Sequence, residues 1–122
     1  MKFAVAASFA AIAATLVAAA PLEKRMHSGA TATWFTQNGN PGSCGQYHSD
    51  NDMIVAVSAQ HHDSSNCGKT ITIEANGVQQ VATIADTCPG CGFADLDLST
   101  GLFQKFAGLD QGVVTMNWWP NW

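Results

Sequence analysis

The stretch from Val81 to Ser99, VATIADTCPGCGFADLDLS, constrains the fold of this chain more than any other. From Val81 to Asp86, successive side chains would point to opposite faces of an extended strand. Both faces would contain apolar residues, which predicts a strand with a core contact on each face. Thr87 to Cys91 follows, and its Pro-Gly pair predicts a tight turn between two cysteines. From Ala94 to Leu98 a second alternation predicts a returning strand that points its leucines one way and its aspartates the other.

This strand, turn and strand is expected to bring three carboxylates, Asp86, Asp95 and Asp97, into one neighbourhood. Carboxylates at the end of a rigid sheet form either a polar site or a solvated rim, and the pattern leaves both interpretations open. Asp97 precedes Ser99 and a predicted helix, so it also suits a structural role, accepting hydrogen bonds from backbone amides near the helix start. Asp86 has a similar structural alternative as a bridge across the turn.

The first 25 residues have the features of export and processing signals. Residues 1–20 contain Lys2 followed by an apolar, alanine-rich run that ends in small residues, which predicts a secretory signal peptide. A membrane anchor is the alternative, but a run of about eighteen residues is short for a span. Residues 21–25 end in Lys24-Arg25, which resembles the dibasic site of a Kex-type processing protease in fungal secreted proteins. A secreted, extracellular domain is therefore expected to cover residues 26–122.

Four cysteines, an even number in a chain expected to be exported, predict two disulfides that stabilise a small domain. They are Cys44, Cys67, Cys88 and Cys91, and the count leaves three pairings open. Zinc is the alternative ligand for Cys88-x-x-Cys91, but the other two cysteines lack a matching paired spacing. A redox-active pair would be accompanied by the helix start of a thioredoxin-like motif, which is missing here.

The predicted mature domain is acidic. Residues 26–122 contain two lysines, Lys69 and Lys105, against eight acidic residues, which gives a net charge of −6. A surface of this sign disfavours nucleic acid and anionic membranes as partners, whereas neutral polysaccharide or a basic protein is compatible with it. His61-His62-Asp63 is not expected to hold a metal, because neighbouring histidines in a polar loop usually face water, and no cofactor is predicted.

Six short strands and one helix are predicted in the mature domain. The strands are residues 31–36, 53–57, 70–74, 78–86, 94–98 and 112–118. Asn76-Gly77 is a strong two-residue hairpin signal, and Ser99 is expected to cap a helix that Gly108 ends. The apolar face of that helix would be Leu102, Phe103, Phe106 and Leu109. Short strands in such number favour a small closed barrel, because closure removes strand edges.

The order of short motifs adds a family resemblance. The motifs are Thr33-Trp34-Phe35, Gly42-Ser43-Cys44-Gly45, Cys67-Gly68, Ile84-Ala85-Asp86-Thr87-Cys88, Asp95-Leu96-Asp97-Leu98-Ser99 and Gly112-Val113-Val114. Together they resemble the double-psi β-barrel superfamily of expansins, barwin, rare lipoprotein A and family 45 glycoside hydrolases. The small secreted members that the chain resembles include kiwellin and papain-inhibitor-type proteins. The resemblance implies a mainly β, six-stranded double-psi β-barrel with one short helix.

An expansin-like alignment implies that Cys44 pairs with Cys67, which leaves Cys88 to pair with Cys91. A polysaccharide groove is implied as well, since expansins line theirs with a Thr-Trp-Tyr stretch and with the Asp of a His-Phe-Asp-Leu-Ser motif. These positions correspond to Thr33, Trp34 and Asp97, and an Asp that bacterial expansins add after the preceding strand corresponds to Asp86. Both aspartates are the catalytic candidates.

The departures from the family pattern argue against catalysis. Asp95 stands where those families have His, and Trp34 to Asn38 contains no acid where the hydrolases place a second catalytic Asp. Inverting hydrolysis needs a general acid and a general base, so the missing base position favours binding without chemistry.

The tryptophans are the aromatic candidates for ligand contact. Trp34 suits either a sugar-stacking position or the core. Trp118, Trp119 and Trp122 lie close together near the C-terminus, and sequential indoles in a strand face opposite sides. We therefore expect one of Trp118 and Trp119 to be buried and another indole to be exposed, and include both as ligand-binding candidates.

The protein is expected to be a monomer. Three functions are compatible with its sequence. The first is a non-catalytic binding protein for cell-wall polysaccharide or a secreted protein. The second is a glycan-cleaving enzyme, of the glycoside hydrolase or lytic transglycosylase type, that uses Asp97 and Asp86. The third is a cysteine-protease inhibitor or effector.

Overall fold

A computed structural model describes residues 26–60 and 64–122. The strands are β1 (His27–Phe35), β2 (Ile54–Ser58), β3 (Thr70–Ala75), β4 (Val78–Cys88), β5 (Leu96–Ser99) and β6 (Val114–Pro120). Between them lie the α-helix α2 (Thr100–Phe103) and two 3₁₀ turns, η1 (Ser64–Asn66) and η2 (Leu109–Gln111). The predicted signal peptide, the predicted pro-segment and His61-His62-Asp63 lie outside the described residues.

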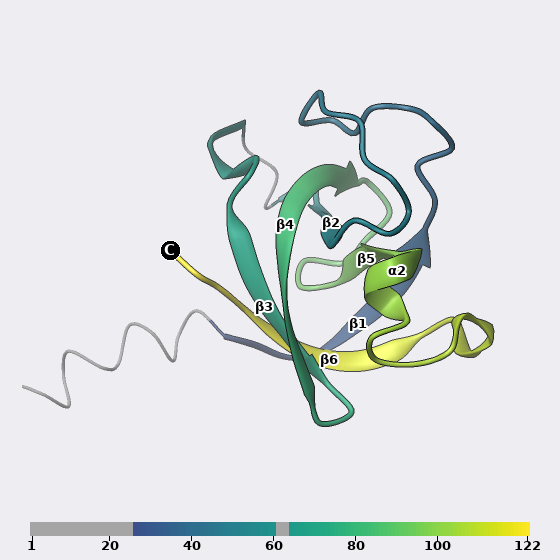
Figure 1. The fold of residues 1–122 in the computed structure, drawn as a ribbon. Coiled ribbons are helices and arrows are strands. Elements are labelled where there is room, and N and C mark those ends of the chain that lie inside the picture. The colour runs from purple at the N-terminus through teal and green to yellow at the C-terminus, as the bar shows by residue number, and fades with distance from the viewer. Residues whose placement is uncertain (1–25, 61–63) are drawn as a thin grey trace, which may run out of the picture.

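The six strands close into a barrel in the order β1-β5-β2-β4-β3-β6 (Figure 1). Two neighbouring pairs, β1–β5 and β2–β4, are parallel, and the other four are antiparallel. The prediction of a mainly β, six-stranded closed barrel with one short helix is therefore confirmed. In the described part of the chain, no helix has the length and apolar character needed to cross a membrane.

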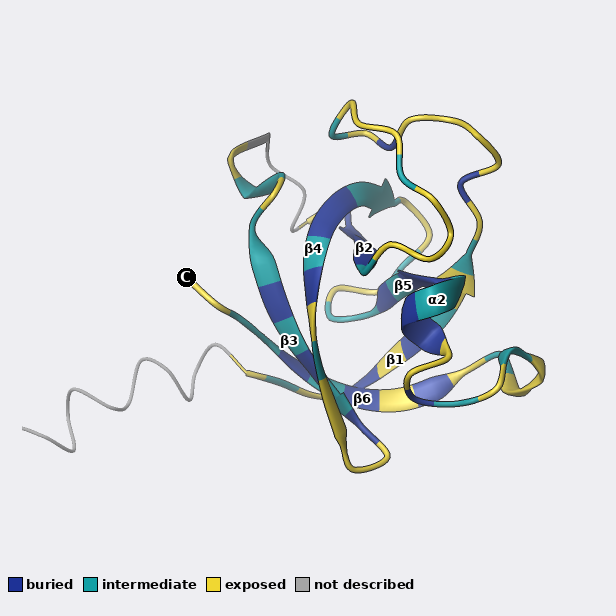
Figure 2. Ribbon diagram, viewed as in Figure 1, coloured by how far each residue is buried: buried dark blue, intermediate teal, exposed yellow. Residues whose placement is uncertain are grey.

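Strand alternation fills the barrel interior. Ile71 and Ile73 of β3 and Leu96 and Leu98 of β5 are fully or almost fully buried, while the residues between them are partly exposed. All five residues of β2 are buried, because loops also cover part of its outer face. Figure 2 shows this contrast between the buried β2 and the mostly exposed loop that precedes it.

Both predicted disulfides are present. Cys44 bonds Cys67, and Cys88 bonds Cys91 across the Pro-Gly turn. The predicted hairpin is also present, with Asn76 and Gly77 at φ values of 51° and 78° between β3 and β4. Positive φ at both central residues is typical of the type I′ turn that Asn-Gly favours.

The predicted helix is wrong in length. Ser99 caps it as expected, with its hydroxyl accepting from the Leu102 amide at 3.3 Å, but α2 ends at Phe103 after a single turn. Gly101 lies against the preceding loop, where its amide donates to the Asp50 carbonyl at 2.8 Å. A Cβ at Gly101 would lie 2.8 Å from the Asn51 Cα, so this turn is set by loop packing rather than by helix propensity.

Other strand boundaries differ from the predicted ones by a few residues, and most of these differences make the strand longer. β1 begins at His27 rather than residue 31, β4 continues past Asp86 to Cys88, and β6 includes Pro120, which pairs with Ile71. By contrast, β5 begins only at Leu96.

Candidate functional site

One row of residues crosses four adjacent strands on the outer face of the barrel. Thr33 of β1 pairs with Asp97 of β5, Asp97 pairs with Ala56 of β2, and Ala56 pairs with Asp86 of β4. Residues opposite each other in a ladder point to the same side of the sheet. We call Thr33, Asp97, Ala56 and Asp86 the polar row. Its two carboxylates flank the small side chain of Ala56.

A β-bulge places Asp86 in this row. Val55 pairs with Ile84, but the next β2 residue, Ala56, pairs with Asp86, so β4 contributes one additional residue, Ala85. Regular pairing would have placed Asp86 opposite Val57, which points into the core. The bulge therefore directs the Asp86 carboxylate outwards, and bulges commonly re-aim a side chain in this way.

Asp97 is the half-buried carboxylate of the row. Leu96 and Leu98 on either side of it anchor β5 in the core, and the Thr33 hydroxyl donates to Asp97 Oδ1 at 2.8 Å. Burial raises the pKa of Asp97, the bond from Thr33 opposes that rise, and the negative charge of Asp86 adds to it. Asp97 is thus harder to ionise than an exposed aspartate.

Asp86 is strongly engaged with the backbone. Its Oδ1 accepts from the amides of Ser43 and Thr87, each at 2.8 Å, and the hydroxyls of these two residues lie 2.8 Å apart. Gly42 permits this approach, since a Cβ there would lie 2.4 Å from the Ala85 carbonyl oxygen. Asp86 therefore joins β4 to the loop after β1, and its bond to the adjacent Thr87 amide does not cross the turn.

Asp95 lies on the same face as Asp97, two residues earlier in the chain. Its Oδ1 accepts from the Thr31 amide at 3.0 Å, so this carboxylate supports β1 at the next position along the strand. The three carboxylates do share one face of the barrel, but only Asp97 and Asp86 belong to the polar row.

Trp34 lies on the opposite side of β1 from Thr33. Strand alternation places Trp34 on the same side as the inward-facing Ala30 and Ala32, but beyond the edge of the core. Its side chain is 37% exposed. Its indole nitrogen donates to the Leu109 carbonyl at 3.0 Å. The structure therefore brings together Thr33, Asp97 and Asp86 without Trp34. Phe35, which alternation assigns to the Thr33 face, was missed as a candidate.

The C-terminal tryptophans separate as alternation predicts. Trp118 is only 2% exposed, donates to the Ala94 carbonyl at 2.7 Å, and stacks on His27 with ring centroids 4.2 Å apart. Its inclusion among surface ligand contacts is corrected, because its indole belongs to the core cluster. Trp119 is partly exposed and Trp122 is 44% exposed.

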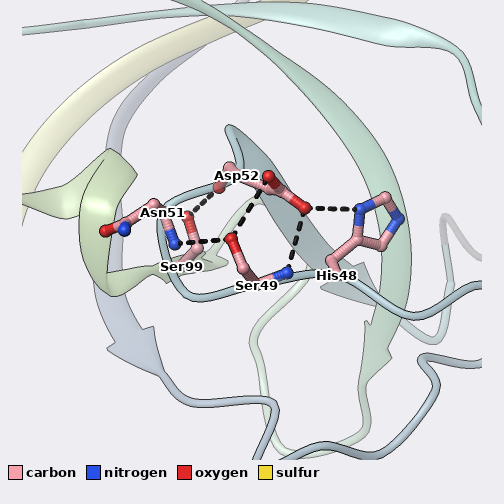
Figure 3. A network of polar contacts seen from close by, with 5 residues as sticks. All are labelled: His48, Ser49, Asn51, Asp52 and Ser99. Carbon is pink, nitrogen blue, oxygen red and sulfur yellow. Dashed lines mark hydrogen bonds and ion pairs between the residues drawn. The ribbon is translucent and has the colours of Figure 1, made fainter.

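A polar network fixes the loop that precedes β2 (Figure 3). Asp52 accepts from the Ser49 amide at 3.0 Å and lies 3.2 Å from His48 Nδ1, and these contacts, the amide first, lower the pKa of Asp52. The Ser49 hydroxyl bonds to Asp52 rather than to His48, so the trio does not have the arrangement of a hydrolytic triad. Ser99 donates to the Asp52 carbonyl at 2.6 Å, which connects the loop to the end of β5. The polar composition of 47–52 was the only sequence signal for this network.

Within residues 26–60 and 64–122, His, Cys, Asp and Glu side chains form no group of three placed to hold a metal ion. The polar row is therefore described by hydrogen bonding and charge alone.

Relatives with similar sequences include a fungal and a bacterial protein. An Aspergillus fumigatus protein named allergen Asp f 7 is 37% identical over 83 residues, which covers 66% of this chain but only 31% of the allergen. A Streptomyces mobaraensis protein named papain inhibitor is 30% identical over 131 residues, which covers 98% of this chain and 91% of the inhibitor. No family model matches the chain.

Solved structures with a similar fold include an inhibitor and an expansin. The Streptomyces papain inhibitor superposes with a TM-score of 0.67 at 29% identity, covering 77% of this chain and 92% of that one. A Clavibacter michiganensis expansin variant in complex with cellohexaose superposes with a TM-score of 0.68 at 22% identity, covering 76% of this chain and 49% of the expansin. The second likeness concerns the fold alone. Together, the closed six-stranded barrel and the near full-length match to the papain inhibitor show that the chain belongs to the expansin/barwin-like double-psi β-barrel superfamily.

Proposed function

We propose that the protein is a secreted, non-catalytic binding protein and that its polar row binds cell-wall polysaccharide. The observation that supports this most directly is the placement of two carboxylates and a hydroxyl along one row. Asp97 and Asp86 stand on either side of Ala56, a small and buried residue of the strand between them.

The chemistry of the row suits a sugar. Carboxylates and hydroxyls hydrogen-bond to sugar hydroxyls, and Phe35 on the Thr33 side of β1 offers an apolar surface to the C–H groups of a ring. A neutral glycan also suits the net charge of −6 in residues 26–122, because it is not repelled by an acidic surface. The expansin of similar fold is described in complex with cellohexaose, which adds support.

Cleavage requires more than two nearby carboxylates. Asp97 and Asp86 lie on strands separated by one intervening strand, β2, so both carboxylates are available to one ligand on the outer face. However, Asp86 Oδ1 already accepts two backbone amides, and Trp34 to Asn38 supplies no further acid. These features favour ligand binding without bond cleavage at the polar row.

The test compares retention on cellulose, chitin and peptidoglycan for four proteins: wild type, Thr33→Val, Asp97→Asn and Thr115→Val. Thr115 is an exposed threonine of β6 outside the row and is the matched control. We expect Asp97→Asn to weaken retention about ten-fold, as for loss of a charge-assisted hydrogen bond, and Thr33→Val by less. Unchanged retention by folded Asp97→Asn would reject the site. Soluble sugar released by wild type but not by Asp97→Asn would instead establish cleavage.

A second candidate, inhibition of a cysteine protease, is favoured by the relative named papain inhibitor. The exposed loop that follows β1 is the natural contact for a protein, and Tyr47 at its centre is 71% exposed. In this case papain activity would fall on addition of the protein, and Tyr47→Ala would reverse the effect while Asp97→Asn would not. Papain activity unaffected by wild type would exclude it as a target.

A further inference from the structure

The longest strand of the barrel, β4, has an open edge near its start. It pairs with β3 from Val78 to Thr83, but its ladder with β2 begins only at Thr83, which pairs with Ile54. Residues 78–82 therefore have a paired strand on one side alone. Figure 1 shows them in the β3–β4 hairpin, which projects at the bottom of the view. We call residues 78–82 of β4 the open edge.

The hairpin geometry determines which backbone groups point to the open edge. In a two-residue hairpin the residues that flank the turn, here Ala75 and Val78, exchange backbone hydrogen bonds. Every second residue then bonds to the neighbouring strand, so Gln80 bonds to β3. Gln79 and Val81 direct their N–H and C=O groups the other way.

Bonds further along β4 agree with this assignment. The Thr83 amide, two residues beyond Val81 and on the same edge, donates to the Met53 carbonyl at 2.9 Å. Outside the ladders, the part of the chain that the structure describes supplies no backbone carbonyl to the amides of Gln79 and Val81. The Val81 carbonyl accepts from the Gln80 side chain at 3.0 Å, an exposed bond that another strand can replace.

The open edge lacks the features that usually protect a strand edge. Its sequence, VQQVA, contains no charged residue and no proline, and its register with β3 is regular. Val78 and Val81 are both exposed, Val81 by 50%. Charges, prolines and bulges are the common devices that prevent edges from pairing. The open edge therefore suits an extended, uncharged strand.

We infer that the open edge binds the open edge of a second copy of this chain, as an antiparallel pair related by a two-fold axis. With Gln80 opposite its own counterpart, Gln79 of each copy lies opposite Val81 of the other. Both opposed pairs then exchange backbone hydrogen bonds, because these are the residues whose N–H and C=O groups point outwards. The neighbouring registers would oppose Gly77 of the turn or Thr83, whose amide is already bonded. Only this register uses both residues.

Charge and size indicate a weak association. No like charges are opposed where the copies meet, because the open edge is neutral. Each copy of residues 26–122 nevertheless carries a net charge of −6, which opposes association at longer range. The contact is also short, whereas stable interfaces use about 20 to 30 residues a side. The expected monomer is therefore replaced by a monomer–dimer equilibrium, and this site is independent of the polar row.

A dilution series of the wild-type protein tests the site by NMR, because each backbone amide gives its own signal. We expect the amides of Gln79 and Val81 to shift with concentration, with a Kd on the order of 1 mM. The amide of Gln80, which bonds to β3, should shift less, and translational diffusion should slow as the concentration rises. Signals and diffusion that do not depend on concentration would overturn the proposal, and so would shifts centred on another surface.

Val81→Pro removes an outward amide without removing a bond to β3, since proline is tolerated where an edge N–H faces solvent. The matched control Val81→Thr keeps the amide and the β-branched shape. Val81→Pro should weaken association about ten-fold or more, because the dimer loses a bond at each of two symmetric positions. Val81→Thr should change it less than about two-fold. Equal association of the two folded variants would overturn the proposal.

The dilution series on wild type decides the question even if Val81→Pro does not fold. A synthetic peptide of alternating threonine and valine is added to dilute wild-type protein as the competing occupant. We expect it to shift the Gln79 and Val81 amides only where it also reduces the dimer. A protein that remains monomeric at every concentration, yet shows these shifts with the peptide, would assign the open edge to a different partner and overturn self-pairing.

Discussion

The hydroxyl of Thr33 donates a hydrogen bond of 2.8 Å to Oδ1 of Asp97, across the parallel pairing of β1 and β5. The bond favours the ionised carboxylate, whereas burial and the nearby charge of Asp86 disfavour it and together prevail. The resulting rise in the pKa of Asp97 connects ionisation of the polar row to the stability of the barrel.

The first prediction concerns that connection. Because the pKa of Asp97 is raised above 3.8 on folding, ionising it costs more in the folded than in the unfolded protein, and its contribution to stability falls as the pH rises above 3.8. The Tm of Asp97→Asn relative to that of wild type should therefore be higher at pH 6 than at pH 3. An equal difference at the two pH values would contradict the shift.

Asp52 provides a comparison of opposite sign. Its pKa is lowered from 3.8, so its contribution to stability is present above that pH and is lost as the pH falls below it. The Tm of Asp52→Asn should accordingly lie further below that of wild type at pH 6 than at pH 3. The same measurement on both variants thus distinguishes the two carboxylates.

The tryptophan pair in β6 should differ sharply in its effect on stability. Trp118→Ala removes a side chain that is 2% exposed, and comparable deletions of buried aromatics cost about 3 to 5 kcal/mol. Trp119→Ala, on the other face of the same strand opposite Thr72, should cost markedly less. Urea unfolding of both variants checks this, and equal losses would argue against the separation of the two indoles.

The two disulfides should also be unequal. Cys44 and Cys67 are 23 residues apart and Cys88 and Cys91 are three apart. Loop-closure entropy then predicts a loss of about 3 kcal/mol for the paired Cys44→Ser and Cys67→Ser substitutions and about 2 kcal/mol for the other pair. The free energies of unfolding in urea give the order directly, and the reverse order would contradict it.

Ser99 should be more sensitive than its neighbour. Its hydroxyl donates to the Asp52 carbonyl and accepts from the Leu102 amide, and the residue is 1% exposed. Ser99→Ala removes the hydrogen-bond partner of the Asp52 carbonyl and of the Leu102 amide, and should lower the free energy of unfolding by about 1 to 3 kcal/mol. Thr100→Ala, which removes a bond of 3.3 Å to the Asp50 carbonyl at the surface, is the control and should cost less than 1 kcal/mol.

Strand periodicity and motif order were sufficient to predict the barrel and the direction of β5. Leu96 and Leu98 point inwards and Asp97 outwards because alternation along an extended strand is a local property. The disulfide partners followed from the resemblance, since the cysteine count leaves three pairings open.

The position of Asp86 depends on pairing rather than on local pattern. Alternation along β4 assigns it to the same side as Ala82 and Ile84, both of which are core residues. Only the bulge at Ala85 moves it to the outer face, and a bulge is defined by the partner strand. The length of α2 escaped prediction for a similar reason, because contacts of Gly101 with the Asp50–Asn51 loop are long-range.

The closed strand order also limits how a protein partner can be recognised. Each of the six strands has a hydrogen-bonded neighbour on both sides over part of its length. Strand addition, the mode in which exposed edges supply backbone hydrogen bonds, is therefore confined to segments that extend beyond the shared ladders, such as residues 78–82 of β4, which pair with β3 alone. Elsewhere on the barrel a partner contacts side chains and loops, so its selectivity is open to change by point substitution without altering the scaffold.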